Sequence, residues 1–292
     1  MRDRLPPILR AMRPSQWVKN VIVGAAPVAA GQLFDGPVIF RAFLAFVAFS
    51  MAASATYLYN DASDVEADRV HPVKQHRPIA AGLVTVRRAT VTGAILAAAA
   101  IALGLVVDLG LGLVLIAYLL LTTAYSLRLK HIAIVDVLAV AAGFTLRAIG
   151  GGQAGRVPLS FWFIVVVTTG ALLLIVGKRM AEFRAEYGDG DDVTRPVLEQ
   201  YSFGLLRSLL LVAALSAVVG YSIWASNTAE QPDRVSAAVW LSLVPFALGV
   251  MRYTWLSDEG RGETPDRLVF RDPFIVGFGL AWVLWYLVAI YV

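Results

Sequence analysis

The chain has 292 residues, of which 58% are hydrophobic and only 16% are charged. This composition excludes an ordinary soluble domain, and the absence of cysteine excludes disulfides, thiolate metal ligands and cysteine catalysis. The net charge of +4 comes from Lys and Arg residues that lie between apolar stretches rather than along one soluble face. This placement argues against nucleic-acid binding.

Apolar stretches follow one another along the whole chain. A transmembrane helix needs roughly 20 mainly apolar residues, and stretches of this kind lie at 17–34, 38–59, 89–107, 110–127, 133–151, 159–178, 203–226, 236–255 and 273–292. They predict an all-α polytopic membrane protein with about nine transmembrane helices. The basic start of the chain precedes an apolar stretch, as in a signal peptide, but the many later spans and Trp17 favour an interfacial anchor. We expect one integral-membrane domain over 1–292, because no soluble stretch is long enough for a second.

Lys and Arg residues set the expected orientation. They gather at 2–19, 69–88, 128–130, 178–195 and 252–271, whereas the connections near 35, 108, 152 and 230 carry almost none. With nine spans, all basic connections fall on one side, which the positive-inside rule assigns to the cytoplasm. We therefore expect an integral plasma-membrane protein whose N-terminus and charged loops are cytoplasmic.

The first charged loop, "NDASDVEADRVHPVKQHRPIAAG" (60–82), directly follows an apolar span. Asp61, Asp64 and Asp68 stand at i, i+3 and i+7, so a continuing helix would place them on one face. Three carboxylates this close repel one another unless a cation joins them, and oxygen ligands without His or Cys favour Mg²⁺. Lys74 and Arg77 follow closely and suit phosphate binding. The alternative is a solvated loop with ordinary surface acids.

This stretch resembles the first aspartate-rich motif, N-D-x-x-D-x-x-x-D followed by R-P, of the UbiA superfamily of intramembrane prenyltransferases. Asn60, Asp61, Asp64 and Asp68 match the motif positions. The resemblance implies a UbiA-like bundle with an active-site cavity on the cytoplasmic side. It also implies that the three aspartates bind Mg²⁺ and are catalytic, and that Asn60 contacts the substrate.

More narrowly, "DVEADRVHPVKQHRPIAAG" together with "RPSQWVKN" (13–20), which contains Lys19, is similar to an actinobacterial branch of the superfamily. That branch implies transfer of a 5-phosphoribosyl group from 5-phosphoribosyl 1-diphosphate to a polyprenyl (decaprenyl) phosphate, with release of diphosphate, during synthesis of arabinan cell-wall precursors. The expected partners are these two substrates and membrane lipid, and a homo-oligomer is compatible with the sequence. The alternative function is transfer of a prenyl group from prenyl diphosphate to an aromatic acceptor.

A second cluster, "GKRMAEFRAEYGDGDD" (177–192), leaves the sixth span. Glu182 and Glu186 are four residues apart and share a helical face, with Lys178 and Arg179 one turn before them. Typical UbiA enzymes carry D-x-x-x-D here, so E-x-x-x-E leaves a second metal in doubt, with Glu186 a further candidate ligand. Lys and Arg suit a donor that carries an additional phosphate. The alternative is positive-inside flanking of a helix end, with the acids as salt-bridge partners.

The connection "YSLRLKHIAIVDV" supplies three more candidates. Lys130 and Asp136 would serve the ribose or its phosphate, or would neutralise each other, and Tyr125 is either a substrate contact or an interfacial aromatic. Arg147, deeper in the same span, is either a cavity residue or part of a buried ion pair.

Other phosphate chemistries fit less well. Asp64 is followed by Val65 rather than by the pattern of CDP-alcohol phosphotransferases, and no P-loop occurs. A transporter would place its polar groups near the middle of the bilayer, whereas most of them here lie at one interface.

Overall fold

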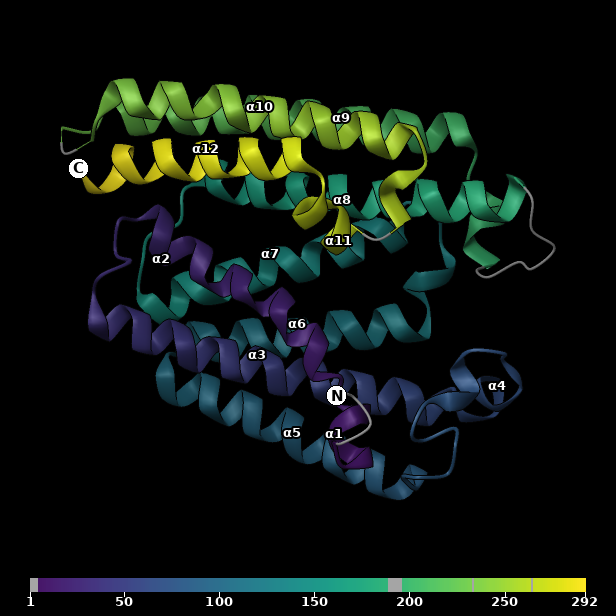
Figure 1. Ribbon diagram of the computed structural model, residues 1–292. Helices are drawn as coiled ribbons and strands as arrows, with labels where there is room; N and C mark the ends of the chain where they lie inside the picture. Colours follow the sequence, from purple (N-terminus) through teal and green to yellow (C-terminus); the bar gives the residue numbers. More distant parts are fainter. Residues whose placement is uncertain (1–4, 189–195, 233, 264) are drawn as a thin grey trace. The chain divides into compact units, whose positions relative to one another are not determined.

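The computed structural model describes residues 5–188, 196–232, 234–263 and 265–292, with the side chains of 186–188, 196, 263 and 265–267 outside this description. All regular elements of these residues are helices (Figure 1). They form two compact units. The first unit comprises Met1–Ser126 and Leu146–Pro158, and the second comprises Leu127–Thr145 and Leu159–Val292.

Among the described residues, 8 helices are long and apolar enough to cross a membrane. They are α3 (Gly36–Ser63), α5 (Val86–Val107), α6 (Leu109–Leu127), α7 (Val135–Gly155), α8 (Phe161–Gly188), α9 (Phe203–Ala229), α10 (Ser236–Asp258) and α12 (Pro273–Tyr291). These helices confirm the all-α membrane fold and correspond to the last eight predicted spans. The remaining α-helices are short: α1 (Pro7–Ala11), α2 (Ala25–Ala29), α4 (Val65–Val70) and α11 (Pro265–Arg271).

The continuous α-helix predicted over 17–34 is wrong. The segment instead forms a 3₁₀-helix, η2 (Pro14–Gly24), which is followed directly by the five-residue α2. A 3₁₀-helix of 11 residues is unusually long. Pro14 at its start, Pro27 in α2 and three consecutive β-branched residues (21–23) all disfavour a regular α-helix here. Hydropathy alone does not distinguish the two helix types.

The first unit is built around the pairing of α3 with α5, which lie side by side in Figure 1. Small residues let these helices approach closely: Gly93 of α5 lies against the backbone of Ala55 in α3. The C-terminal part of α7 contacts η2 at Gly151, where any Cβ atom would overlap the carbonyl oxygen of Val23. The core beneath these contacts consists of Val23, Ala45, Ala48, Phe49, Ala52, Ala100, Leu111, Leu115, Tyr118 and Ala154.

In the second unit, α9 packs against both α8 and α10, and α10 packs against α12. Its core contains Val137, Leu173, Val176, Met180, Val197, Leu198, Tyr201, Leu206, Leu210, Ala213, Tyr253, Leu256 and Ile275. Side chains cap the helix starts: Ser202 accepts a hydrogen bond from the backbone of Leu205 at α9, and Asp272 accepts from Phe274 and Ile275 at α12. The caps fix where each span begins and therefore where its flanking polar residues lie.

Candidate functional site

The first acidic motif lies where α3 gives way to α4. Asp64 interrupts the helix between Ser63 and Val65, so the single continuing helix expected here is wrong in detail. Helical hydrogen bonds nevertheless run through the junction, from the Asp64 N–H to the Asn60 carbonyl and from the Asp68 N–H to the Asp64 carbonyl. The i, i+7 spacing of Asp61 and Asp68 is therefore preserved, and both residues are only 3% exposed.

Two arginines bind the buried carboxylates. Arg77 donates to Asp61 Oδ1 at 3.1 Å and to Asp68 Oδ2 at 2.7 Å, and thus joins the two acids. Arg13 donates to both oxygens of Asp61, at 2.6 and 2.9 Å. A buried carboxylate is costly unless it is paired and hydrogen-bonded. The structure thus places Arg77 against Asp61 and Asp68, while its predicted contact with substrate phosphate stays a prediction; Arg13 is an additional partner of Asp61.

Arg13 holds an unusual backbone conformation. Its φ of 55° places it in the left-handed region, which non-glycine residues rarely adopt, and Pro14 follows it. The guanidinium lies 4.8 Å from the centre of the Tyr57 ring, and this contact adds a cation–π interaction to its hydrogen bonds with Asp61. Strained backbone at a charged cluster suggests a functional constraint.

The donor atoms at this junction suit a hard cation. Oδ1 of Asn60 is buried and has no hydrogen-bond partner, and it adjoins Asp61 in the same helix. An orphaned amide oxygen next to carboxylates is a ligand set for Mg²⁺, which keeps several waters and needs few protein ligands. No three acidic or histidine side chains in the described part of the chain meet closely enough to share an ion. In this structure the arginines bind the carboxylates. These residues fit Mg²⁺ because their side chains offer carboxylate and amide oxygens, which are the ligands that Mg²⁺ prefers.

Three other predicted contacts lie elsewhere in the first unit. Lys74 begins the short 3₁₀-helix η3 (Lys74–His76), where its backbone N–H donates to His71 Nδ1 at 3.3 Å. Lys19 is a half-buried residue of η2, and Tyr125 is a half-buried residue in the last turn of α6. Lys74 therefore lies just after the aspartate motif in the chain. The substrate contacts of Lys74, Lys19 and Tyr125 stay predictions.

The second cluster forms a buried ion-pair network in the second unit. Arg179 donates from Nε to Asp136 Oδ2 at 2.7 Å and from Nη1 to Glu182 Oε2 at 2.6 Å. Asp136 is completely buried and Arg179 is 3% exposed, whereas the Lys178 side chain is 45% exposed and lies 3.8 Å from Glu182. Asp136 therefore pairs with Arg179, while Lys178 remains accessible to solvent and its substrate contact stays a prediction.

Tyr201 extends this network to the loop before α7. Its hydroxyl donates to Asp136 Oδ1 and accepts the backbone N–H of Ile134 at 2.6 Å. Ile134 has a φ of 68°, which is strained for a β-branched residue. Gln200 adds two contacts, accepting from the Ala133 N–H and donating to the His131 carbonyl. The loop is thus fixed by side chains about 65 residues further along the chain.

The environment of Tyr201 determines its protonation. Burial, followed by the hydrogen bond to Asp136, raises the pKa of Tyr201 above its ordinary value of 10.0. The hydroxyl therefore stays protonated at neutral pH and acts as a permanent donor to Asp136 rather than as a base.

Lys130 and Glu186 complete the second unit's candidates. Lys130 is half-buried in the 3₁₀-helix η4 (Leu129–His131), which is held by Gln200. Glu186 lies in α8, and its side chain is outside the described residues. A metal-binding role for Glu186 therefore stays a prediction.

Arg147 links parts of the first unit. Its Nε donates to Asn20 Oδ1 at 2.7 Å and its Nη2 donates to the Tyr118 hydroxyl at 2.8 Å, with the guanidinium 4.7 Å from the centre of the Tyr118 ring. Asn20 in turn donates to the Ser50 hydroxyl at 3.0 Å. These contacts tie η2 to α3, α6 and α7, so Arg147 has a structural role.

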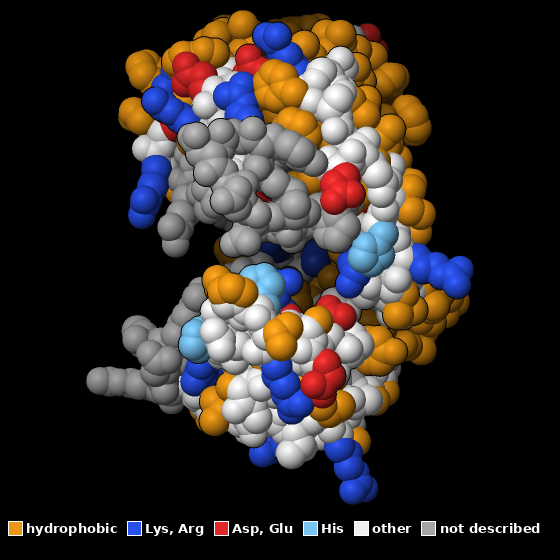
Figure 2. Space-filling view, turned by 90° about the vertical axis from the view of Figure 1, so that its right-hand side faces the viewer, with side chains coloured by type: hydrophobic (Ala, Val, Ile, Leu, Met, Phe, Trp, Pro, Cys, Tyr) orange, Lys and Arg blue, Asp and Glu red, His pale blue; other side chains and the backbone are white. Residues whose placement is uncertain are grey.

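Arg13, Gln200 and Tyr201 were not singled out from the sequence. Arg13 belongs to the stretch "RPSQWVKN", and its position before Pro14 was the available signal, because proline restricts the preceding backbone. No local pattern marks Gln200 or Tyr201, since their partners are distant in sequence. In the view of Figure 2, Lys, Arg, Asp, Glu and His side chains are visible among hydrophobic and other side chains.

Known proteins share both the sequence and the fold. The sequence pattern of the UbiA prenyltransferase family matches residues 20–271. The chain is 38% identical over 301 residues to decaprenyl-phosphate phosphoribosyltransferase of Corynebacterium glutamicum, covering 100% of this chain and 90% of the relative. It is also 38% identical over 280 residues to the Mycobacterium tuberculosis enzyme of the same name, covering 94% and 91%.

A UbiA homolog from Archaeoglobus fulgidus, solved with GPP and Mg²⁺, has a TM-score of 0.71 over 96% of each chain at 16% identity. The likeness to this structure supports the fold alone. The identities of 38% show that the chain is related more closely to the two phosphoribosyltransferases. Family membership is supported by the aspartate motif, by the helical architecture and by the sequence match over most of the chain. The chain belongs to the UbiA prenyltransferase family.

Proposed function

We propose that this membrane protein transfers the 5-phosphoribosyl group of 5-phosphoribosyl 1-diphosphate to a polyprenyl phosphate, decaprenyl phosphate being the acceptor type named for its relatives. The relationship to two phosphoribosyltransferases over nearly the full chain carries this proposal. The reaction belongs to the synthesis of arabinan precursors of the cell wall. Both units would act as a single transferase domain over 1–292, because the family match includes residues of each.

Asn60, Asp61, Asp64 and Asp68 would hold Mg²⁺ through oxygen atoms, in keeping with the unpaired Asn60 Oδ1. The bound ion supplies positive charge that stabilises the departing diphosphate. The metal-bound A. fulgidus structure supports divalent-metal use in this fold.

Arginine and lysine side chains would bind the donor phosphates. Arg13 and Arg77 already lie within 3.1 Å of the motif carboxylates and present planar arrays of N–H donors there. Lys74 and Lys178 would contribute single charges, with Lys178 directed to the extra phosphate of this donor. Arg179 would act by holding Asp136 and Glu182 in place.

In the reaction, an oxygen of the acceptor phosphate forms a bond to C1 of the ribose while the bond from C1 to the diphosphate breaks. A phosphate monoester loses its second proton near pH ~6. The acceptor is therefore already an anion at neutral pH, and no general base is required. Lys130 would orient the ribose or its 5-phosphate, whereas the completely buried Asp136 would support the site by holding Arg179 and Tyr201.

The charged loops and the N-terminus would be cytoplasmic, following the distribution of Lys and Arg. This orientation requires a ninth crossing by residues 14–29. The 3₁₀-helix η2 and α2 would together extend roughly 30 Å if they continued in one direction, which equals the hydrocarbon thickness of a bilayer.

A two-mixture assay on purified protein tests the reaction. One mixture holds labelled 5-phosphoribosyl 1-diphosphate with polyprenyl phosphate, and the other holds prenyl diphosphate with 4-hydroxybenzoate. We expect labelled lipid product from the first mixture only. Product from the second mixture alone would favour the conventional prenyltransferase reaction instead.

A further inference from the structure

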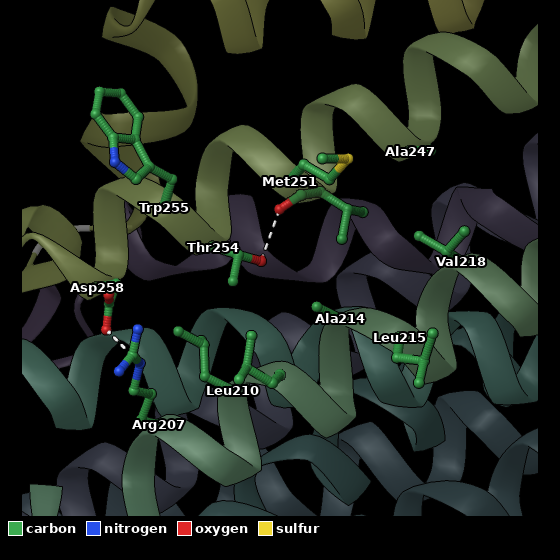
Figure 3. Close-up of a pocket in the computed structure, with 12 residues that line it drawn as sticks. Arg207, Leu210, Ala214, Leu215, Val218, Ala247, Met251, Thr254, Trp255 and Asp258 are labelled. Atoms are coloured by element: carbon green, nitrogen blue, oxygen red, sulfur yellow. Dashed lines mark hydrogen bonds and ion pairs between the residues drawn. The ribbon is translucent and has the colours of Figure 1, made fainter. Parts of the chain in front are cut away.

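A groove runs between α9 and α10 in the second unit, away from the charged clusters. Its volume is about 520 Å³, and its lining residues are Arg207, Leu210, Leu211, Ala214, Leu215, Val218, Ala247, Val250, Met251, Thr254, Trp255 and Asp258 (Figure 3). Each helix contributes six residues at i, i+3, i+4, i+7, i+8 and i+11, which form a single helical face. The helices are antiparallel, so Arg207 meets Asp258 at one end and Val218 lies near Ala247 at the other.

The groove is apolar along its length and polar at one end. Leu211, Leu215 and Met251 are 53%, 67% and 65% exposed and form its walls. The only polar side chain between the two ends is Thr254, and its hydroxyl donates to the Val250 carbonyl at 2.8 Å. The groove therefore offers a hydrocarbon surface that opens at a charged mouth.

The length of the groove matches one lipid chain. Eleven residues separate Arg207 from Val218, and at about 1.5 Å per residue the groove extends roughly 16 Å. Half of a bilayer's hydrocarbon core is about 15 Å thick. A chain that entered at the mouth would thus reach approximately the middle of the bilayer.

The charged end of the groove presents both a cation, Arg207, and a hydrogen-bond acceptor, Asp258. Arg207 is 57% exposed, and its Nε lies 3.2 Å from Asp258 Oδ1. That oxygen is buried but accepts no hydrogen bond, because the contact with Arg207 has ion-pair distance without hydrogen-bond alignment. Trp255 beside them is held by Arg252, whose guanidinium lies 4.5 Å from the ring centre. An anionic group and a hydrogen-bond donor would complement this pair.

We propose that the α9–α10 groove binds one glycerophospholipid whose headgroup carries an N–H or O–H donor in addition to its phosphate. One acyl chain lies along the groove, the phosphate pairs with Arg207, and the headgroup donor bonds to the Asp258 carboxylate, whose side chain is 33% exposed. Polyprenyl phosphate fits less well, because its phosphate is dianionic near neutral pH and would lie beside the Asp258 carboxylate without offering a donor. A basic helix end of another protein would be repelled by Arg207.

The test is native mass spectrometry of the full-length protein after delipidation in detergent. Phosphatidylethanolamine, phosphatidylcholine and polyprenyl phosphate are titrated separately, since the choline headgroup carries the same phosphate but no N–H or O–H donor. We expect one molecule of phosphatidylethanolamine to bind about tenfold or more tightly than phosphatidylcholine, which is the usual effect of one charge-assisted hydrogen bond. Asp258→Leu, which leaves no hydrogen-bond acceptor at this position, should remove this preference.

Arg207→Gln should weaken phosphatidylethanolamine binding by about tenfold or more through loss of the phosphate contact. Ala247→Phe should exclude the lipid by filling the groove. Arg261→Gln is the matched control, because Arg261 is 65% exposed close to the same helix end but does not line the groove. Equal binding of the two phospholipids to wild type, unchanged binding after Arg207→Gln, or preferential Arg207-dependent binding of polyprenyl phosphate would each overturn the proposal.

Discussion

The hydroxyl of Tyr201 donates a hydrogen bond of 2.5 Å to Asp136, across a sequence separation of 65 residues. The same oxygen accepts the N–H of strained Ile134, so one side chain fixes both the buried carboxylate and the loop that leads to it. Asp136 also pairs with Arg179, which reaches Glu182. The position of the second charged cluster therefore depends on Tyr201.

Removing this hydroxyl tests that dependence. Tyr201→Phe should lower kcat/KM for 5-phosphoribosyl 1-diphosphate by about tenfold or more, since a hydrogen bond to a charged group typically contributes about 1.5–3 kcal/mol. Tyr253→Phe is the control, because the Tyr253 hydroxyl donates a 3.2 Å bond to the uncharged Leu174 carbonyl in the same unit. Steady-state kinetics and thermal unfolding of both variants provide the measurement. Unchanged kinetics for Tyr201→Phe would show that the hydrogen bond from Tyr201 to Asp136 is not needed for turnover.

The aspartate motif can be tested together with metal removal. Asp61→Asn, Asp64→Asn and Asp68→Asn should each lower turnover about a hundredfold, comparable to the loss of one preorganised electrostatic contact. Asn keeps the shape of each side chain and a carbonyl acceptor for the arginines. Glu66→Gln should remain active, because the Glu66 side chain, which shares α4 with Asp68, is 81% exposed and pairs with Arg69.

Chelation should reproduce the loss in the wild type, and added Mg²⁺ should restore activity. The readout besides turnover is a Mg²⁺-dependent rise in melting temperature in the presence of donor, which the three Asn variants should lack. Full activity in EDTA would rule out the metal proposal.

Lys178 and Arg179 are adjacent, but the structure predicts different consequences of replacing them. Lys178→Ala should raise the KM for 5-phosphoribosyl 1-diphosphate by about ten- to a hundredfold through loss of a charge-assisted contact. Its KM for polyprenyl phosphate should change little, and Lys178→Arg should recover part of the loss. An unchanged donor KM would mean that Lys178 merely flanks the helix end.

Arg179→Ala should instead destabilise the protein by about 3–5 kcal/mol, because it leaves the buried Asp136 carboxylate without its cation. Thermal unfolding in detergent, compared with Lys178→Ala, distinguishes these effects. A stable Arg179→Ala protein with an altered donor KM would indicate direct substrate contact.

Orientation can be measured with single cysteines, since the chain has none of its own. Ser63 and Gln231 are both exposed and lie at opposite ends of predicted crossings. In intact cells, a membrane-impermeant thiol reagent should label Gln231→Cys but not Ser63→Cys, while both should react after permeabilisation. The reverse pattern would place the aspartate motif outside the cell.

Asp272 supplies a pH-dependent contribution to stability. Hydrogen bonds from Arg252 at 2.8 and 3.2 Å, supported by the backbone N–H groups of Ile275 and Phe274, lower the pKa of Asp272 below its ordinary value of 3.8. A depressed carboxyl pKa stabilises the fold above the unfolded-state pKa, and this stabilisation is lost as pH falls through the folded-state pKa.

Asp272→Asn should therefore lower the melting temperature at pH 7, and the difference from wild type should shrink as pH falls below about 4. Glu230→Gln is a suitable control, since Glu230 is an exposed acidic residue of the same unit. A difference that stays constant down to pH 3 would argue against the ionised cap.

The sequence predicted the membrane-spanning helices well because hydropathy depends on local composition. The predicted 203–226 and 236–255 compare with Phe203–Ala229 and Ser236–Asp258 in the structure. Residues 17–34 were assigned incorrectly because a 3₁₀-helix and an α-helix can share the same hydropathy. Their difference lies in backbone geometry, which the prolines only partly indicated.

The candidate site was predictable only in part for a related reason. Asp61, Asp68 and Arg77 lie within 16 positions of one another, so their spacing in sequence already placed them together. Arg13 reaches Asp61 across 48 residues and Tyr201 reaches Asp136 across 65, and the packing of helices decides which distant residues meet. No charge pattern or hydropathy window contains that information.

The contact between Gly151 and Val23 limits how this chain can vary during evolution. Any side chain at Gly151 would force the backbones of α7 and η2 apart, whereas Gly170 in α8 has open space around its Cα. Alanine at Gly170 would favour the helix by roughly 0.5–1 kcal/mol. Under selection for folding, variation should accumulate at position 170 while position 151 stays fixed, so the unusual 3₁₀ geometry is preserved by a residue more than 120 positions away.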